Sequence, residues 1–268
     1  MGISAIAREK LLARQRLPDF FGSEAVKPSY DGLGLSNIAT LAVEWLAPDA
    51  PILSETPANP AFNPELLAAS QVSEAWKSWQ NQAPINHVVM LILDGFGYEQ
   101  LQSLANSQDI PTIAKACESP QGFFMPATSV YPSTTVTALT SAATGYAPEQ
   151  FKQTSISRFT SAGADAGNDN FKGYRTPSDA FSQLRESLLA KNSNQKSFTY
   201  LYVPTIDMVS HRYGPLSSSY KAEVATLDFA LKKQVIEPLA GRSDTVLLVV
   251  AENGQRYSNL ENTLWLEE

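Results

Sequence analysis

Apolar residues fall in blocks along this chain, and their spacing predicts alternating strands and helices. The run 88–93 is apolar at every position, which is typical of a strand buried on both faces of a sheet. Similar runs predict strands over 198–203 and 244–251, and a further strand is predicted over 122–130. Apolar residues with helical spacing predict helices at 98–105, 111–117, 135–143, 181–189 and 224–235.

Strands separated by helices of this length indicate parallel βαβ units. We therefore predict an α/β fold, with a mostly parallel sheet and helices on both faces. The first part of the chain differs, because its many prolines interrupt regular structure. It predicts only an amphipathic helix over 3–16 and a helix or two within 66–79. The expected organisation is a Pro-rich, partly helical N-terminal extension, 1–85, followed by an α/β core, 86–268.

Composition and charge narrow the classes of function. The chain has 20 basic and 27 acidic residues, and this net charge of −7 argues against a partner such as a nucleic-acid polymer. No apolar run approaches the roughly 20 residues that span a bilayer, and the N-terminus lacks the apolar segment of a signal peptide. The single cysteine, Cys117, excludes an internal disulfide. Together these features predict a cytoplasmic protein.

Polar residues gather where the predicted strands end. Asp94 follows the first strand, Asp207 and His211 come shortly after the strand at 198–203, and Glu252 and Asn253 follow the last one. Because the carboxyl ends of parallel strands meet at one edge of a sheet, we expect these side chains to lie together. Asp207 and His211 are four residues apart, so both can reach one metal ion from a single helical turn.

A threonine at the start of a predicted helix adds a second kind of group. Thr135 ends the segment Tyr131-Pro132-Ser133-Thr134-Thr135, directly before the helix at 135–143. Free backbone N–H groups at a helix N-terminus favour a bound phosphate. The sequence therefore predicts one site that binds an anion and a metal. The other histidine, His87, precedes the first strand and is expected to be a packing or surface residue.

Four motifs follow one another along the chain: Leu-Ile-Leu-Asp-Gly-Phe-Gly at 91–97, Tyr-Pro-Ser-Thr-Thr at 131–135, Ala-Thr-Gly-Tyr-Ala-Pro-Glu at 143–149, and Asp-Met-Val-Ser-His-Arg-Tyr-Gly-Pro at 207–215. They resemble, in the same order, the motifs of the type I phosphodiesterase/nucleotide pyrophosphatase family of the alkaline phosphatase superfamily. The resemblance implies an alkaline-phosphatase-like core and a hydrolase that acts on phosphodiesters or nucleotide pyrophosphates. It also implies a small phosphorylated substrate.

The same resemblance implies a two-metal site in which Thr135 is the nucleophile. Asp94 would share one divalent metal with Thr135, and this metal would lower the pKa of the hydroxyl group. Asp207 and His211 would hold the other metal, while Glu252 and Asn253 take the places of two further ligands. Zinc is the metal expected for an Asp/His ligand set, with manganese as the alternative.

The chain departs from the family pattern in three places. The last strand of the family ends in Asp-His-Gly, whereas this chain has Glu252-Asn253-Gly254, and an amide oxygen is a weak ligand for a transition metal. After Glu149 the chain runs to Phe151-Lys152-Gln153 without the family's His-Gly and phosphate-binding asparagine, as if a cap region were absent. Only 14 residues follow Gly254, so the family's third histidine has no counterpart.

These departures predict weak and unequal metal binding, and they leave alternatives open. The first is an enzyme whose activity is impaired. The second is a non-catalytic relative, a pseudoenzyme, that binds a phosphorylated ligand or a protein partner. The third, a phosphomutase-like enzyme of the same superfamily, is disfavoured because such enzymes usually carry serine where Thr135 stands.

Overall fold

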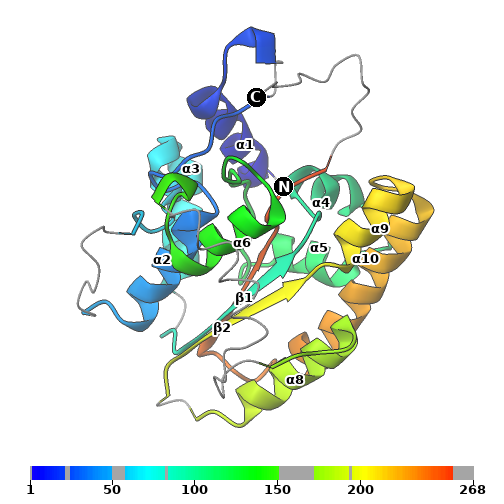
Figure 1. Cartoon of the computed structure of the whole chain (residues 1–268). Helices are drawn as coiled ribbons and strands as arrows, with labels where there is room; N and C mark the ends of the chain where they lie inside the picture. Colours follow the sequence, from blue (N-terminus) through cyan, green and yellow to red (C-terminus); the bar gives the residue numbers. More distant parts are fainter. Residues whose placement is uncertain are drawn as a thin grey trace.

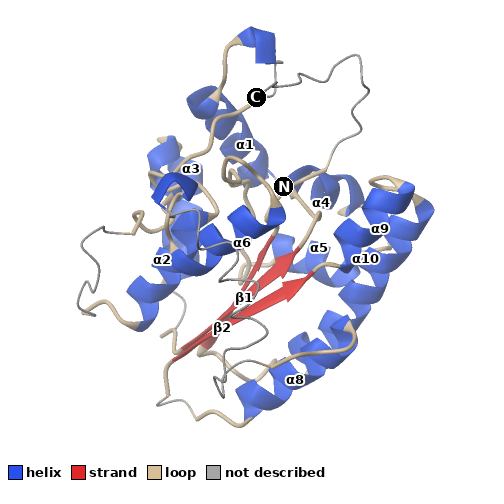
Figure 2. Ribbon diagram, viewed as in Figure 1, coloured by secondary structure: helices blue, strands red, loops and turns tan. Residues whose placement is uncertain are grey.

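The computed structural model describes residues 2–21, 25–49, 58–81, 84–150, 172–192 and 195–255. Helices surround a small central sheet (Figures 1 and 2). None of the helices among these residues is long and apolar enough to cross a membrane. The elements are α1 (Gly2–Gln15), η1 (Asp19–Phe21), α2 (Ser36–Leu46), η2 (Pro64–Leu67), α3 (Ser70–Gln80), β1 (His87–Leu93), α4 (Tyr98–Leu104), α5 (Pro111–Glu118), α6 (Thr135–Thr144), η3 (Pro148–Gln150), α8 (Pro177–Leu189), β2 (Ser197–Val203), α9 (Thr205–Tyr213), α10 (Ser218–Leu231), η4 (Lys232–Ile236) and β3 (Thr245–Val250).

The described sheet is parallel, with the order β2-β1-β3. All seven residues of β1 are buried, as expected for a central strand that is apolar at every position after His87. His87 pairs with Ser197 of β2 and with Thr245 of β3, so the three strands begin level. Their carboxyl ends are therefore level too. This confirms the predicted α/β class and three of the four predicted strands.

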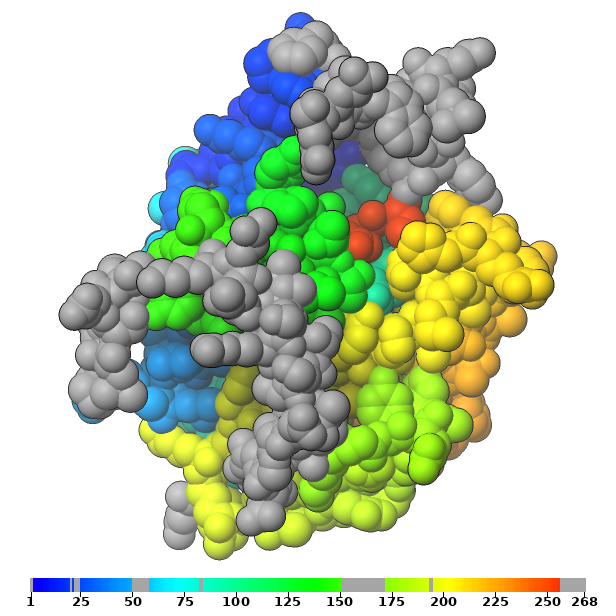
Figure 3. All heavy atoms as spheres, viewed as in Figure 1, coloured from blue at the N-terminus to red at the C-terminus, as the bar shows by residue number. Residues whose placement is uncertain are grey.

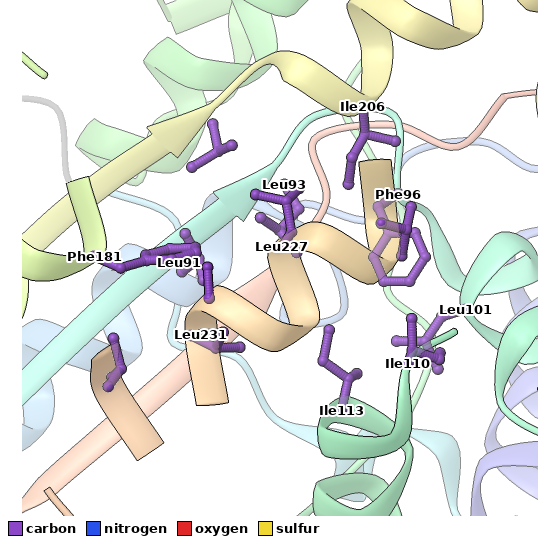
Figure 4. Packing of buried hydrophobic residues seen from close by; sticks show 14 of the residues in the cluster. Leu91, Leu93, Phe96, Leu101, Ile110, Ile113, Phe181, Ile206, Leu227 and Leu231 are labelled. Carbon is purple, nitrogen blue, oxygen red and sulfur yellow. The ribbon is translucent and has the colours of Figure 1, made fainter. Parts of the chain in front are cut away.

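Successive side chains of β1 point to opposite faces, and each face is covered. Val89, Leu91 and Leu93 pack against α4, α5, α8 and α10, where Leu227 and Leu231 of α10 lie next to them (Figure 4). Met90 and Ile92 point the other way and pack against α2, α3 and α6. Figure 1 shows these two groups of helices on either side of the sheet.

The N-terminal segment contributes to this packing. Helix α1 lies against α3 and η2, and it buries Ala7 and Leu11 there among Leu67 and Val72. The amphipathic N-terminal helix therefore covers the domain with its apolar side. Helix α2 packs on α6, so part of the segment before residue 85 forms one cover of the sheet.

Two sequence predictions differ from the structure. The segment 122–130 is not a strand: Thr128 forms a single parallel bridge with Gly34, through hydrogen bonds to Leu33 and Leu35. Its apolar residues reflect packing, because Phe123 and Met125 lie against two hydrophobic clusters. The set of predicted helices is also incomplete: α2 lies in a segment whose prolines indicate irregular structure, and α9 is not predicted either.

Candidate active site

The level strand ends bring three acidic side chains to one edge of the sheet. Asp94 directly follows β1 and is 1% exposed, and Glu252 follows β3 and is fully buried. Asp207 lies in the first turn of α9, after β2, and is half-buried. Figure 3 shows the residues around 250–255, in red, at the surface between the green segment near α6 and the yellow helix α9. The edge is thus bordered by the segments that carry the predicted site.

Thr135 is the first residue of α6, and its side chain is half-buried. The N-cap is the preceding residue, Thr134, whose side chain makes no cap hydrogen bond. The Thr134 hydroxyl instead lies 2.9 Å from the hydroxyl of Thr137. The loop before the helix is held in place because the Tyr131 N–H donates to the Tyr30 hydroxyl over 3.1 Å. No side chain of the cap therefore competes with an anion for the first N–H groups of this helix.

Asp94 and Glu252 form a buried pair of carboxyl groups. The Tyr202 hydroxyl donates to Asp94 Oδ2 over 2.5 Å. The Asn253 amide donates to Glu252 Oε1 over a long 3.4 Å. The pKa of Glu252 is raised to about 9, chiefly by burial and secondly by the adjacent Asp94. Contact with the Thr135 hydroxyl lowers this pKa. Glu252 therefore lies next to both Asp94 and the Thr135 hydroxyl.

Tyr202 is suited to its role as a donor to Asp94. Burial, and then its hydrogen bond to Asp94, raises the pKa of the Tyr202 phenol well above its usual range. The phenol therefore stays protonated near neutral pH and holds one oxygen of the carboxylate.

Asp207 links the acidic pair to His211. The Gln255 amide donates to Asp207 Oδ1, and His211 Nε2 lies 3.3 Å from Asp207 Oδ2. Burial, and next the charge of Asp94, raises the pKa of Asp207, whereas His211 and Gln255 lower it. His211 is on the rim, since 77% of its side chain is exposed.

Unsatisfied oxygens at this edge test whether a metal would fit. Among the described residues, several buried acceptor atoms here lack a hydrogen-bond donor, and they include Asp94 Oδ1, Glu252 Oε2, Asn253 Oδ1 and Gln255 Oε1. Buried oxygens without donors are costly, and a divalent cation satisfies such oxygens. Over the same residues, however, no three His, Cys, Asp or Glu side chains are arranged to hold a metal ion. The donor chemistry therefore fits a cation beside Asp94 and Glu252, and the pair Asp207 and His211 supplies only two ligands.

The structure thus brings Asp94, Thr135, Asp207 and Glu252 together, with His211 and Asn253 next to them. His87 lies at the opposite end of β1, fully buried, with its Nδ1 2.9 Å from the Ser197 hydroxyl. Sequence reasoning missed Tyr202 and Gln255. The only signal for these two residues was their position, one near the end of β2 and the other directly after Glu252-Asn253-Gly254. The segment Phe151-Lys152-Gln153 lies outside the described residues.

A parallel α/β domain with acidic residues, a histidine and a helix-start threonine at its carboxyl edge has the architecture of the alkaline-phosphatase-like class. The comparison with protein families narrows the class further. The chain belongs to the type I phosphodiesterase / nucleotide pyrophosphatase family, whose model matches residues 88–154 and 151–267. A search of curated proteins finds no match. Membership links the chain to hydrolysis of phosphodiesters or nucleotide pyrophosphates, to divalent metals and to small phosphorylated substrates.

Proposed function

We propose that this chain is a divalent-metal-dependent hydrolase of phosphodiesters or nucleotide pyrophosphates, with Thr135 as its nucleophile. The observation that carries the proposal is the contact of Thr135, at the start of α6, with Glu252, which is itself paired with Asp94. A hydroxyl beside two carboxyl groups with unsatisfied oxygens is poorly placed for packing alone. It is well placed for a reaction in which a cation and an anion meet.

The proposed reaction has two steps. Thr135 Oγ attacks phosphorus, and the bond from phosphorus to the leaving oxygen breaks as the threonine ester forms. The leaving oxygen takes a proton equivalent to the one that Thr135 loses. Water then hydrolyses the ester and restores the hydroxyl. Backbone N–H groups at the start of α6 bind the non-bridging phosphate oxygens, and Tyr202 keeps Asp94 oriented.

The cation chemistry follows from the same residues. Asp94, Glu252 and Thr135 would hold one divalent cation, which supplies a lowered pKa for the attacking hydroxyl. Asp207 and His211 would hold a second, with fewer ligands. The Asp/His ligand set favours zinc, with manganese as the alternative. We expect unequal occupancy, because Asn253 offers a neutral amide oxygen where the family pattern has a histidine.

The organisation of the chain supports the view that a cap region is absent. The family model matches in two segments that adjoin at residues 151–154, which is the position where the motif pattern is interrupted. We infer an N-terminal extension over 1–85 and an alkaline-phosphatase-like core over 86–268. Because α2 and α3 cover one face of β1, the extension is a part of the packed domain.

Turnover of an aryl phosphodiester tests the proposal directly. Purified protein would be stripped with a chelator and then assayed with bis(4-nitrophenyl) phosphate, first without metal and then with Zn²⁺ or Mn²⁺. We expect turnover only with metal, and mass spectrometry of the quenched reaction should locate a phosphoryl adduct on Thr135. Metal-independent turnover, or an adduct elsewhere, would contradict the mechanism.

The second candidate is a non-catalytic relative that binds a phosphorylated ligand or a protein partner. The observation that favours it is Asn253, which removes an imidazole from the edge of the sheet. This candidate predicts that nucleotides raise the melting temperature while no aryl phosphodiester or nucleotide is hydrolysed with any divalent metal. That result would replace the hydrolase proposal.

A further inference from the structure

The segment after β3 closes on the turn after β1, and two glycines of the turn allow this contact. A Cβ atom on Gly97 would lie 2.5 Å from the Cα atom of Gly254, closer than any such contact in proteins. A Cβ atom on Gly95, which has a φ of +73°, would lie 3.1 Å from the side-chain amide of Gln255. The motif Asp94-Gly95-Phe96-Gly97 therefore receives residues 254 and 255 directly against its backbone.

Gln255 joins three elements at this contact. Its side-chain amide nitrogen donates to Asp207 Oδ1 on α9, while its backbone oxygen accepts a hydrogen bond from the Gln100 side chain on α4. Gln100 is 5% exposed. The orientation of the Gln255 amide is fixed by chemistry, because an ionised carboxylate only accepts and so faces the NH₂ group.

We propose that Gln255 is a positioning residue of the site: its amide holds Asp207 in the orientation in which Oδ2 stays beside His211. This proposal rests on the proposed function, because it takes the ligand of Asp207 to be a divalent cation. Outer partners of this kind orient ligating carboxylates, and their loss typically lowers metal affinity by about 10-fold to 100-fold. Gln100 contributes indirectly, because it anchors the segment that carries Gln255 and Glu252.

Substitution of Gln255 by leucine tests this role. Leucine has a similar volume but no amide, so the packing on Gly95 is kept while the hydrogen bond to Asp207 is lost. We expect Gln255→Leu to raise the Kd for Mn²⁺ at the weaker site, that of Asp207 and His211, by about 10-fold or more, as measured by calorimetry with the metal alone. The melting temperature in chelator should change little, and Gln255→Glu, which replaces the donor with a like charge, should not rescue the affinity.

A matched control exists on α8. Gln183 also donates its amide to an aspartate, Asp179 Oδ1 over 3.2 Å, and to a backbone oxygen, that of Gly173. Gln183→Leu should therefore leave Mn²⁺ affinity unchanged. A Gln255→Leu variant that is folded and binds Mn²⁺ as tightly as the wild type would overturn the proposal.

A metal-free measurement separates this inference from the proposed function. In chelator, the effects of Gln255→Leu and Asp207→Ala on the stability to unfolding should be non-additive, because the two side chains interact without metal. If the wild-type protein binds no Mn²⁺, the divalent cation of the proposed function is refuted. The comparison of the single and double variants in chelator would still decide whether Gln255 holds Asp207. Additive effects in that comparison would overturn the positioning role.

Discussion

Replacement of Thr135 by alanine separates catalysis from stability more sharply than any other change at the site. The side chain is half-buried at the first position of α6, and the N-cap is Thr134. Alanine is a good helix former at this position, and the principal loss is the contact of the hydroxyl with Glu252. A half-buried substitution of this kind costs about 1 kcal/mol or less.

The expected change in melting temperature is correspondingly small. With about 2.1 cal/mol/K of unfolding entropy per residue, a chain of 268 residues loses about 2 °C for each kcal/mol. The expected change in turnover is much larger. Loss of a nucleophile should lower kcat for bis(4-nitrophenyl) phosphate by at least about 1,000-fold, which corresponds to about 4 kcal/mol of transition-state stabilisation. Thr135→Ser keeps a hydroxyl and should retain turnover.

The neighbouring threonine provides the control. Thr134→Ala also removes a hydroxyl from the start of α6, and it breaks the contact with Thr137 without touching the proposed nucleophile. It should lower the melting temperature as much as Thr135→Ala or more, yet keep kcat within about threefold, or about 0.7 kcal/mol. Undiminished turnover in Thr135→Ala would remove Thr135 from the mechanism. Equal losses in both variants would assign the effect to the helix start as a whole.

Three further predictions concern the metal, the altered ligands and pH. Calorimetry with Zn²⁺ should show at most one site occupied at micromolar concentration, because the second metal site has only Asp207 and His211 as ligands. Two tight and equal sites would contradict this prediction. Glu252→Asp combined with Asn253→His should tighten metal binding and raise aryl phosphodiester hydrolysis at least tenfold, or about 1.4 kcal/mol. Burial lowers the pKa of His87 from its usual value of 6.5. The free energy of unfolding measured in urea should therefore have its full value above pH 6.5 and decrease as the pH falls below 6.5, because the unfolded chain then binds a proton more readily than the folded one. His87→Gln should weaken this fall, and an equal loss of stability in both proteins would exclude His87 as its cause.

The strands of this fold could be predicted because their sequences are simple. The unbroken apolar run 88–93 indicated burial on both faces, and β1, which contains this run, is indeed the central strand. The error at 122–130 has the same origin. Phe123 and Met125 are apolar because they fill gaps beside the helices, and Thr128 pairs with Gly34 instead of with a strand. A short apolar block in the sequence does not distinguish a buried strand from an irregular segment that packs on helices.

The candidate site was predictable to the extent that it follows from topology. Because the parallel strands are in level register, the residues that follow them lie at one edge of the sheet. These residues include Asp94, Asp207 and Glu252. Tyr202 and Gln255 could not be predicted in the same way. Each acts on a carboxylate from another segment, and the partner of such a donor depends on strand register and on the path of the chain after β3. The local sequence determines neither the strand register nor the path of the chain after β3.

The backbone after β3 is held by contacts that do not involve the side chains of residues 252 and 253. Ser129 donates to the backbone oxygen of Glu252, Gln100 donates to that of Gln255, and Gly254 lies against Gly97. New side chains at 252 and 253 should therefore leave the strand end where it is. Suppose that the variant that combines Glu252→Asp with Asn253→His folds and yet gains neither metal affinity nor turnover. A displaced backbone at the strand end would not explain that result. The deficit would then lie in ligands that the family supplies from other segments.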